Sequence, residues 1–131
     1  MIYKEISYEE YWNLRDQTGA YLVLWSNGDK AWYLHGKLHR EDGPAYEGVG
    51  GTKFWCLNGL YHREDGPAVE WLSGTKEWIL DGNPHREDGP AIEWANGTNY
   101  WYLNDRWYET EEEWRIAIDE LRTKEIKDLI V

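Results

Sequence analysis

The sequence predicts a mainly β fold, in which repeated β-hairpins form one elongated, single antiparallel sheet with a short helix at each end. The first reason is that the string HREDGPA starts at His39, His62 and His85, at a fixed period of 23 residues. A period of 20–50 residues is typical of proteins in which each unit buries its face only against its neighbours. The other residues that follow this period are Trp32, Trp55, Trp78 and Trp101; Leu34, Leu57, Leu80 and Leu103; and Gly28, Gly51, Gly74 and Gly97.

The second reason is the pattern of strands and turns inside one period. Residues 68–71 alternate in polarity as a strand does, and residues 75–80 read as the return strand. Ser73-Gly74 stands between them, and the equivalent Asn-Gly pairs are strong signals for a hairpin turn with positive φ. Proline cannot donate to a sheet ladder, so each HREDGP segment is expected to form a loop in which the arginine pairs with a nearby carboxylate.

The third reason is a helix signal at each end of a single domain, residues 1–131. Residues 1–20 form the predicted N-terminal helical segment, with a capping box at Ser7 and Glu10. Residues 21–107 form the hairpin repeats. Residues 108–131 form the capping helix, which begins where a fourth HREDGPA would stand and is expected to cover the last open edge or face of the sheet. Its apolar tail leaves open whether the protein is a monomer or a homodimer.

Composition narrows the classes of partner. The net charge of −11 argues against binding to nucleic acid or to an anionic membrane, because both need a basic surface. It permits a partner with a basic face. The single cysteine is Cys56, and the equivalent strand position in the other repeats is occupied by tyrosine or isoleucine. Cys56 is therefore interpreted as a packing residue. The chain shows neither a secretory signal nor a membrane span, and a cytoplasmic location is expected.

The sequence offers no catalytic residues, no cofactor site and no metal site. Hairpins of two strands repeat at roughly 10 Å, so the three equivalent histidines lie too far apart to share one ion. An active site normally needs groups with different tasks, whereas here the polar residues are copied three times. We therefore expect a protein that is not an enzyme.

Binding is the remaining task, and arginine and aromatic residues are the side chains most enriched in interface hot spots. With both helices folded onto one face, most of the tryptophans are expected in the core. The candidate binding residues are then Arg40, Arg63, Arg86, Tyr33, Tyr46, Tyr61, Tyr100, Tyr102, Trp107 and Tyr108.

The strings WYLHGKLHREDGPA, WCLNGLYHREDGPA and WILDGNPHREDGPA resemble a divergent form of the MORN repeat over residues 21–107. The resemblance implies an extended sheet of hairpins and a role as a scaffold, a dimerisation module or a phospholipid binder. The HREDGPA form is similar to proteins of tailed phages and giant viruses, which implies a viral origin and location in the host cytoplasm.

The leading hypothesis is a phage-encoded, non-enzymatic protein that binds and inhibits a host protein, such as a defence component. A second hypothesis is a small-molecule sponge that holds a nucleotide or sugar between aromatic rings, with Arg40, Arg63 or Arg86 on a phosphate. A structural scaffold or lipid-associated protein is the third.

Overall fold

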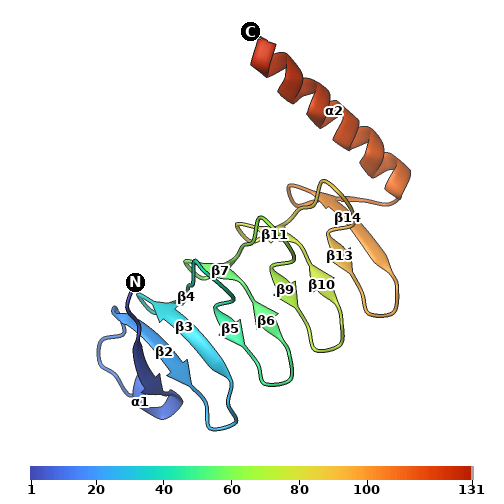
Figure 1. Ribbon diagram of the computed structural model, residues 1–131. Coiled ribbons are helices and arrows are strands. Elements are labelled where there is room, and N and C mark those ends of the chain that lie inside the picture. The colour runs from blue at the N-terminus through green and yellow to red at the C-terminus, as the bar shows by residue number, and fades with distance from the viewer. Residues whose placement is uncertain (131) are drawn as a thin grey trace.

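The fold is mainly β and contains one large, mostly antiparallel sheet of eleven short strands (Figure 1). The computed structural model describes residues 1–130, so the last residue of the predicted C-terminal helix, Val131, lies outside the described chain. The strands of the large sheet are β1 (Lys4–Ser7), β2 (Ala20–Leu24), β3 (Lys30–Leu34), β4 (Lys37–Leu38), β5 (Tyr46–Glu47), β6 (Lys53–Phe54), β9 (Val69–Glu70), β10 (Lys76–Glu77), β13 (Ile92–Glu93), β14 (Asn99–Leu103) and β15 (Arg106–Tyr108).

Two smaller sheets and two helices complete the described chain. The small sheets are β7 (Cys56–Leu57) with β8 (Leu60–Tyr61), and β11 (Ile79–Leu80) with β12 (Asn83–Pro84); the helices are α1 (Tyr8–Trp12) and α2 (Glu111–Ile130). The large sheet runs in the order β1-β2-β3-β5-β6-β9-β10-β13-β14-β15, with β4 paired to β3. Because the strands follow one another in chain order, the hairpins stand side by side in a row (Figure 1).

The tight turn of the first hairpin is made as the sequence predicts. Antiparallel strands β2 and β3 flank Asn27-Gly28, and Gly28 has a φ of 99°, a backbone conformation that glycine adopts without steric cost. The same turn joins β9 to β10 at Gly74, whose φ is 98°. The Asn-Gly and Ser-Gly signals therefore marked these reversals correctly.

The expected single sheet is divided into one large and two small sheets, because the return strand changes neighbours at its tryptophan. The N–H of Trp55 donates to Ala68 O at 2.8 Å. Just before Trp55 in the chain, β6 pairs with β9. Beyond Trp55 the chain continues as β7 and pairs instead with β8. Two backbone bonds link this small sheet to the preceding part of the chain: Gly59 N donates to Leu38 O at 2.8 Å, and Arg40 N donates to Cys56 O at 3.1 Å.

The N-terminal segment is less helical than expected. Residues 4–7 form β1, which pairs in parallel with β2, and α1 spans only five residues. A parallel pair needs a long crossover, and the chain between β1 and β2 supplies one. Half of the predicted capping box is present, since Glu10 N donates to Ser7 Oγ at 3.1 Å, while the Glu10 carboxylate accepts from the Ser7 hydroxyl, also at 3.1 Å. The large sheet is therefore antiparallel except at this edge.

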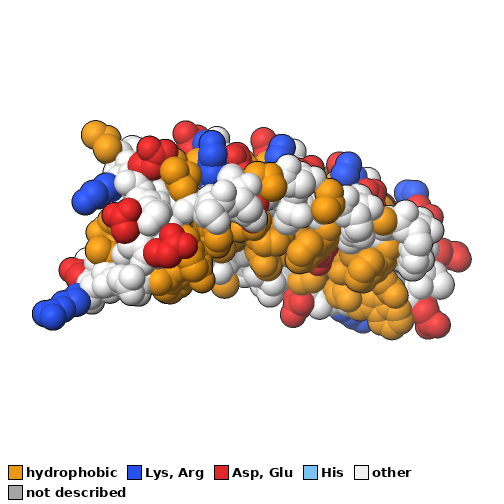
Figure 2. Space-filling view, turned by 90° about the horizontal axis from the view of Figure 1, so that it is seen from below, with side chains coloured by type: hydrophobic (Ala, Val, Ile, Leu, Met, Phe, Trp, Pro, Cys, Tyr) orange, Lys and Arg blue, Asp and Glu red, His pale blue; other side chains and the backbone are white. Residues whose placement is uncertain are grey.

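The two faces of the large sheet differ sharply in chemistry. On the charged face, opposite charges are paired across neighbouring strands, which favours the register. The residues of this ladder, in order across the sheet, are Lys30, Glu47, Lys53, Glu70, Lys76 and Glu93. On the aromatic face the corresponding residues are Ala31, Tyr46, Phe54, Val69, Glu77, Ile92 and Tyr100. Figure 2 shows charges along one side of the hairpin tips and hydrophobic side chains along the other.

The two helices pack on opposite faces of the sheet, not on one face as expected. Tyr11 of α1 stacks on Tyr33, with ring centroids 4.8 Å apart, and Trp114 of α2 packs on Trp101 at 4.7 Å. Side chains alternate along a strand, so Tyr33 belongs to the aromatic face and Trp101 to the other. Each helix covers only one end of the sheet. The predicted tryptophan core is therefore wrong, and the four tryptophans of that row are half-buried.

Candidate functional site

Each HREDGP segment forms a loop held by its own arginine. In the first loop (residues 39–44), Arg40 Nε donates to Asp42 Oδ1 at 3.1 Å and Arg40 Nη1 donates to Pro44 O at 3.2 Å. The guanidinium carbon lies 3.9 Å from the ring centroid of Trp32, within the range of a cation–π contact. The expected pairing of arginine with a loop carboxylate is confirmed.

The second loop (residues 62–67) and the third loop (residues 85–90) repeat these contacts. Arg63 lies 3.9 Å from the ring of Trp55, and Arg86 lies 3.7 Å from the ring of Trp78. Their bonds to aspartate and to the proline carbonyl measure 2.9–3.1 Å. Three of the predicted ligand-binding residues therefore already have internal partners, and a phosphate would have to compete with a bound carboxylate.

The histidines of the loops join each hairpin to the next. Asn58 N donates to His39 Nδ1 at 2.9 Å, and Asn104 N donates to His85 Nδ1 at 2.9 Å. In both histidines Nδ1 therefore acts as the hydrogen-bond acceptor for a backbone N–H of the next hairpin. His62 Nδ1 accepts from Asp81 N at 3.0 Å and also lies 3.1 Å from the Asp81 carboxylate. Among residues 1–130, no group of His, Cys, Asp and Glu is arranged to hold a metal ion.

A second row of acceptors joins the hairpins near their tips. Asp29 Oδ1 accepts from Val49 N at 2.9 Å, and Thr52 Oγ1 accepts from Leu72 N at 3.2 Å. Asp29 also accepts from the hydroxyl of Tyr46 at 2.7 Å. This bond is the main reason that the pKa of Asp29 lies below its usual value and that the pKa of Tyr46 rises to about 12. Neighbouring hairpins are thus fastened at both ends.

The predicted aromatic binding residues fall into three groups. Tyr33 is half-buried against Tyr11, and Tyr46 is half-buried with its hydroxyl held by Asp29. Tyr108 lies on the opposite face and packs against the cluster of Leu103, Trp114 and Ile118. The rest lie on the aromatic face, where Tyr102 is half-buried opposite Trp107, and where Tyr61, Tyr100 and Trp107 are exposed.

Two exposed residues of the same face were missed. Trp71 and Trp94 are 43% and 47% exposed, and they border a groove of about 630 Å³ with Leu72 and Glu77. Trp71 Nε1 donates to Glu77 Oε2 at 2.6 Å, which fixes its indole. The signal was present, because Trp25, Trp71 and Trp94 fall on the same 23-residue period. We call the set of Tyr61, Trp71, Trp94, Tyr100 and Trp107 the aromatic strip.

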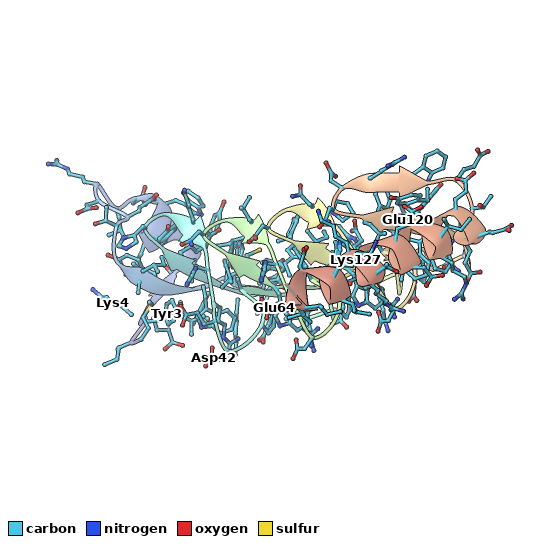
Figure 3. All side chains as sticks on the ribbon, turned by 90° about the horizontal axis from the view of Figure 1, so that it is seen from above. Tyr3, Lys4, Asp42, Glu64, Glu120 and Lys127 are labelled. Atoms are coloured by element: carbon cyan, nitrogen blue, oxygen red, sulfur yellow. The ribbon has the colours of Figure 1, made fainter. Side chains whose placement is uncertain are left out.

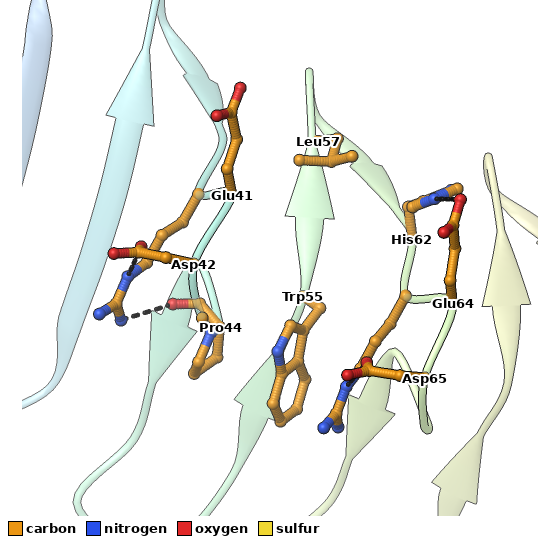
Figure 4. A pocket seen from close by; sticks show the side chains of 11 residues that line it. Glu41, Asp42, Pro44, Trp55, Leu57, His62, Glu64 and Asp65 are labelled. Carbon is orange, nitrogen blue, oxygen red and sulfur yellow. Dashed lines mark hydrogen bonds and ion pairs between the residues drawn. The ribbon is translucent and has the colours of Figure 1, made fainter. Parts of the chain in front are cut away.

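On the other side of the protein, clefts separate successive loops, and Figure 4 shows the first of them. The first cleft, about 770 Å³, lies between the first and second loops and has Trp55 and Leu57 on its floor. The second cleft, about 550 Å³, lies between the second and third loops, with Trp78 and Leu80. Carboxylates outnumber guanidinium groups in both. Of the two, the first cleft is larger and has the greater excess of negative charge.

Comparisons with protein-family models, with curated proteins and with solved structures return no match for this chain. Neither described helix is long and apolar enough to cross a membrane.

Proposed function

We propose that the protein is a non-enzymatic protein-binding module and that the aromatic strip is its contact surface. The observation that carries the proposal is the exposure of five large rings on one face, between 37% and 51% of each side chain. Exposed apolar area of this kind is typical of an interaction site, and tryptophan and tyrosine are the residues most often found in hot spots.

The surroundings of the strip favour a protein partner. The strip lies on hairpins whose backbone is fastened at both ends by side-chain acceptors, so this surface is ordered before binding. A surface that is already ordered loses less conformational entropy on association. The rings of Trp94 and Tyr100 pack edge to face, with centroids 6.4 Å apart, which adds to this order.

The wider setting of the proposal comes from the sequence. The chain is proposed to be an elongated array of 23-residue MORN-like hairpins, with α2 as a cap over Trp101, the last tryptophan of the repeated row. Its resemblance to phage and giant-virus proteins supports a host protein as the partner, such as a defence component. The net charge of −11 supports a partner with a basic face.

Affinity purification from bacterial lysate tests this function. The wild type and a Leu60→Ala control are expected to retain the same protein at constant stoichiometry, whereas Trp71→Ala/Trp94→Ala loses it. Leu60 is a suitable control because it is 50% exposed and, paired with Leu57, faces the other side. Recovery of no stoichiometric protein by the wild type, or of the same protein by the tryptophan variant, would overturn the proposal.

A sugar is the second candidate ligand, and the groove between Trp71 and Trp94 is the observation that favours it. Two exposed indoles with Glu77 between them can stack on a sugar ring and accept from its hydroxyls. Mass spectrometry of the denatured protein would detect a retained sugar or nucleotide. A small molecule bound one to one, and lost in Trp71→Ala/Trp94→Ala, would favour this candidate over a protein partner.

A further inference from the structure

The row of loops forms a groove on the side opposite the aromatic strip. We call the first and second clefts together the loop groove. Figure 3 shows Asp42 and Glu64 on this side, where α2 also lies. Tyr3 limits the groove at one end, because its hydroxyl donates to His39 O at 3.0 Å. At the other end α2 covers the third loop, so the groove is bounded by the chain itself.

Helix α2 shows which side chains dock on the loops. Trp114 packs on Trp101 and donates its Nε1 proton to Arg86 O at 3.3 Å. Ile118, one turn later, is 3% exposed. Arg122, another turn on, donates from Nη2 to Glu87 O at 3.3 Å and borders the second cleft. These residues are four apart and share one helix face, so an aromatic, aliphatic and guanidinium stripe faces the loop row.

The charge of the two clefts differs because of Arg122. Four carboxylates and three guanidinium groups line the second cleft, and the third guanidinium comes from α2. Four carboxylates and only two guanidinium groups line the first cleft. In the first cleft Arg40 is bound to Asp42, and Arg63 is bound to Asp65. The excess negative charge of this cleft therefore comes from the carboxylates of Glu41 and Glu64. These two side chains are 79% and 85% exposed, and each lies 3.6 Å from a histidine Nε2, too far for a hydrogen bond.

We propose that the first cleft binds an arginine-bearing helix of a partner protein, whose guanidinium supplies there the positive charge that Arg122 of α2 supplies at the edge of the second cleft. The guanidinium of the partner lies between Glu41 and Glu64, and an apolar side chain of the same helix face lies against Trp55 and Leu57. Arginine suits this position because its planar donors match carboxylates. This surface is separate from the aromatic strip, and the two proposals do not depend on each other.

A peptide copied from α2 provides the probe. A fluorescent, stapled helix of residues 114–127 carries Trp114, Ile118 and Arg122 and can be titrated into the full-length protein by anisotropy. The protein retains its own α2, so the third loop stays covered. We expect saturable binding that weakens with added salt, because the charges are exposed. Binding is expected to be unchanged in Trp71→Ala/Trp94→Ala, which distinguishes this site from the aromatic strip.

A double-mutant cycle then identifies the contact. Glu41→Gln/Glu64→Gln in the protein and Arg122→Gln in the peptide should each weaken binding about fivefold, the effect of one or two exposed ion pairs. When the substituted protein is titrated with the substituted peptide, the loss of affinity should be little more than with either change alone. Glu5→Gln/Glu9→Gln is the matched control with the same change of charge, and it should bind as the wild type does. No binding, fully additive losses or equal loss in the control would overturn the proposal.

Discussion

Trp114 lies on Trp101 with ring centroids 4.7 Å apart, in the place that an arginine occupies over each of the other three tryptophans of the row. The position equivalent to those arginines in the last copy is Glu109, whose carboxylate cannot make a cation–π contact. Helix α2 supplies an indole instead. Because Trp114 takes the place of the missing arginine, Trp101 is covered even though no fourth loop follows it.

Trp114→Ala should remove this contact and loosen α2. Trp114 is 3% exposed, and truncation of a buried tryptophan typically costs ~3–5 kcal/mol. We expect a loss at the lower end of that range, measured by chemical denaturation, with reduced helical circular dichroism. Ile116→Ala, on an exposed position of the same helix, should change stability by less than ~0.5 kcal/mol. Equal effects of the two substitutions would contradict the packing role of Trp114.

Arg63→Lys should destabilise the second loop although the charge is kept. Lysine cannot reproduce the planar stack on Trp55 or the paired bonds to Asp65 and Pro67. The expected loss is ~1–2 kcal/mol in the free energy of unfolding. Arg15→Lys, at an exposed position, is the control and should be neutral. A neutral Arg63→Lys would show that charge alone holds the loop.

Gly66→Ala should disturb the same loop from the other side. A Cβ at position 66 would lie 2.8 Å from the guanidinium carbon of Arg63, closer than atoms pack. We expect ~1–3 kcal/mol of destabilisation, measured by thermal and chemical unfolding. At Gly48 the nearest atoms are 3.5 Å away, so Gly48→Ala should be tolerated. Gly66→Ala combined with Arg63→Lys should cost less than the sum, because both release the same guanidinium.

Asp29 should make the protein sensitive to acid. Its pKa is lowered in the fold by the Tyr46 hydroxyl and the Val49 N–H, so the ionised form is favoured by folding. The stabilisation is present above the usual value of 3.8 and is lost as pH falls through the lower folded pKa. Below pH 3.8 the free energy of unfolding should therefore fall less steeply with decreasing pH in Asp29→Asn than in the wild type. An identical pH profile in both proteins would contradict the assignment.

Tyr46 should show the opposite behaviour in alkali. Its pKa is raised from 10.0 to about 12, chiefly by its bond to Asp29, so the protonated form is favoured by folding. That stabilisation is present below pH 10.0 and is lost as pH rises through about 12. The pKa values of Tyr3, Tyr11, Tyr33 and Tyr61 are also raised, so ultraviolet titration should show several late phenols, and Tyr46→Phe should remove one phenol that titrates at about 12. In Asp29→Asn the same phenol should titrate earlier, because the charge of the acceptor is gone.

The prediction of the hairpin turns succeeded because those signals are local. Gly28 and Gly74 have the positive φ that their turns require, and Ser7 caps the helix that follows it. The pairing of Arg40 with Asp42 was also within reach, since the residues are two apart. Backbone geometry over a few residues is governed by sterics and nearby hydrogen bonds, and both depend on the residue types that are adjacent in the sequence.

The faces of the sheet could not be assigned in the same way. The tryptophan row was expected in the core, yet Trp32, Trp55 and Trp78 lie under arginines and are only half-buried. Trp71 and Trp94 follow the same period and are exposed. Periodicity tells which residues share a face, but it does not tell which face the helices cover.

The 23-residue period, the turns and the helix caps were therefore determined by the sequence alone. The tertiary structure decided that α1 and α2 lie on opposite faces, that β1 runs parallel to β2, and that the loop arginines have internal partners. These features depend on which distant surfaces meet, as when Trp114 reaches Trp101. Such contacts are selected by packing and desolvation across the whole chain, and local patterns do not specify them.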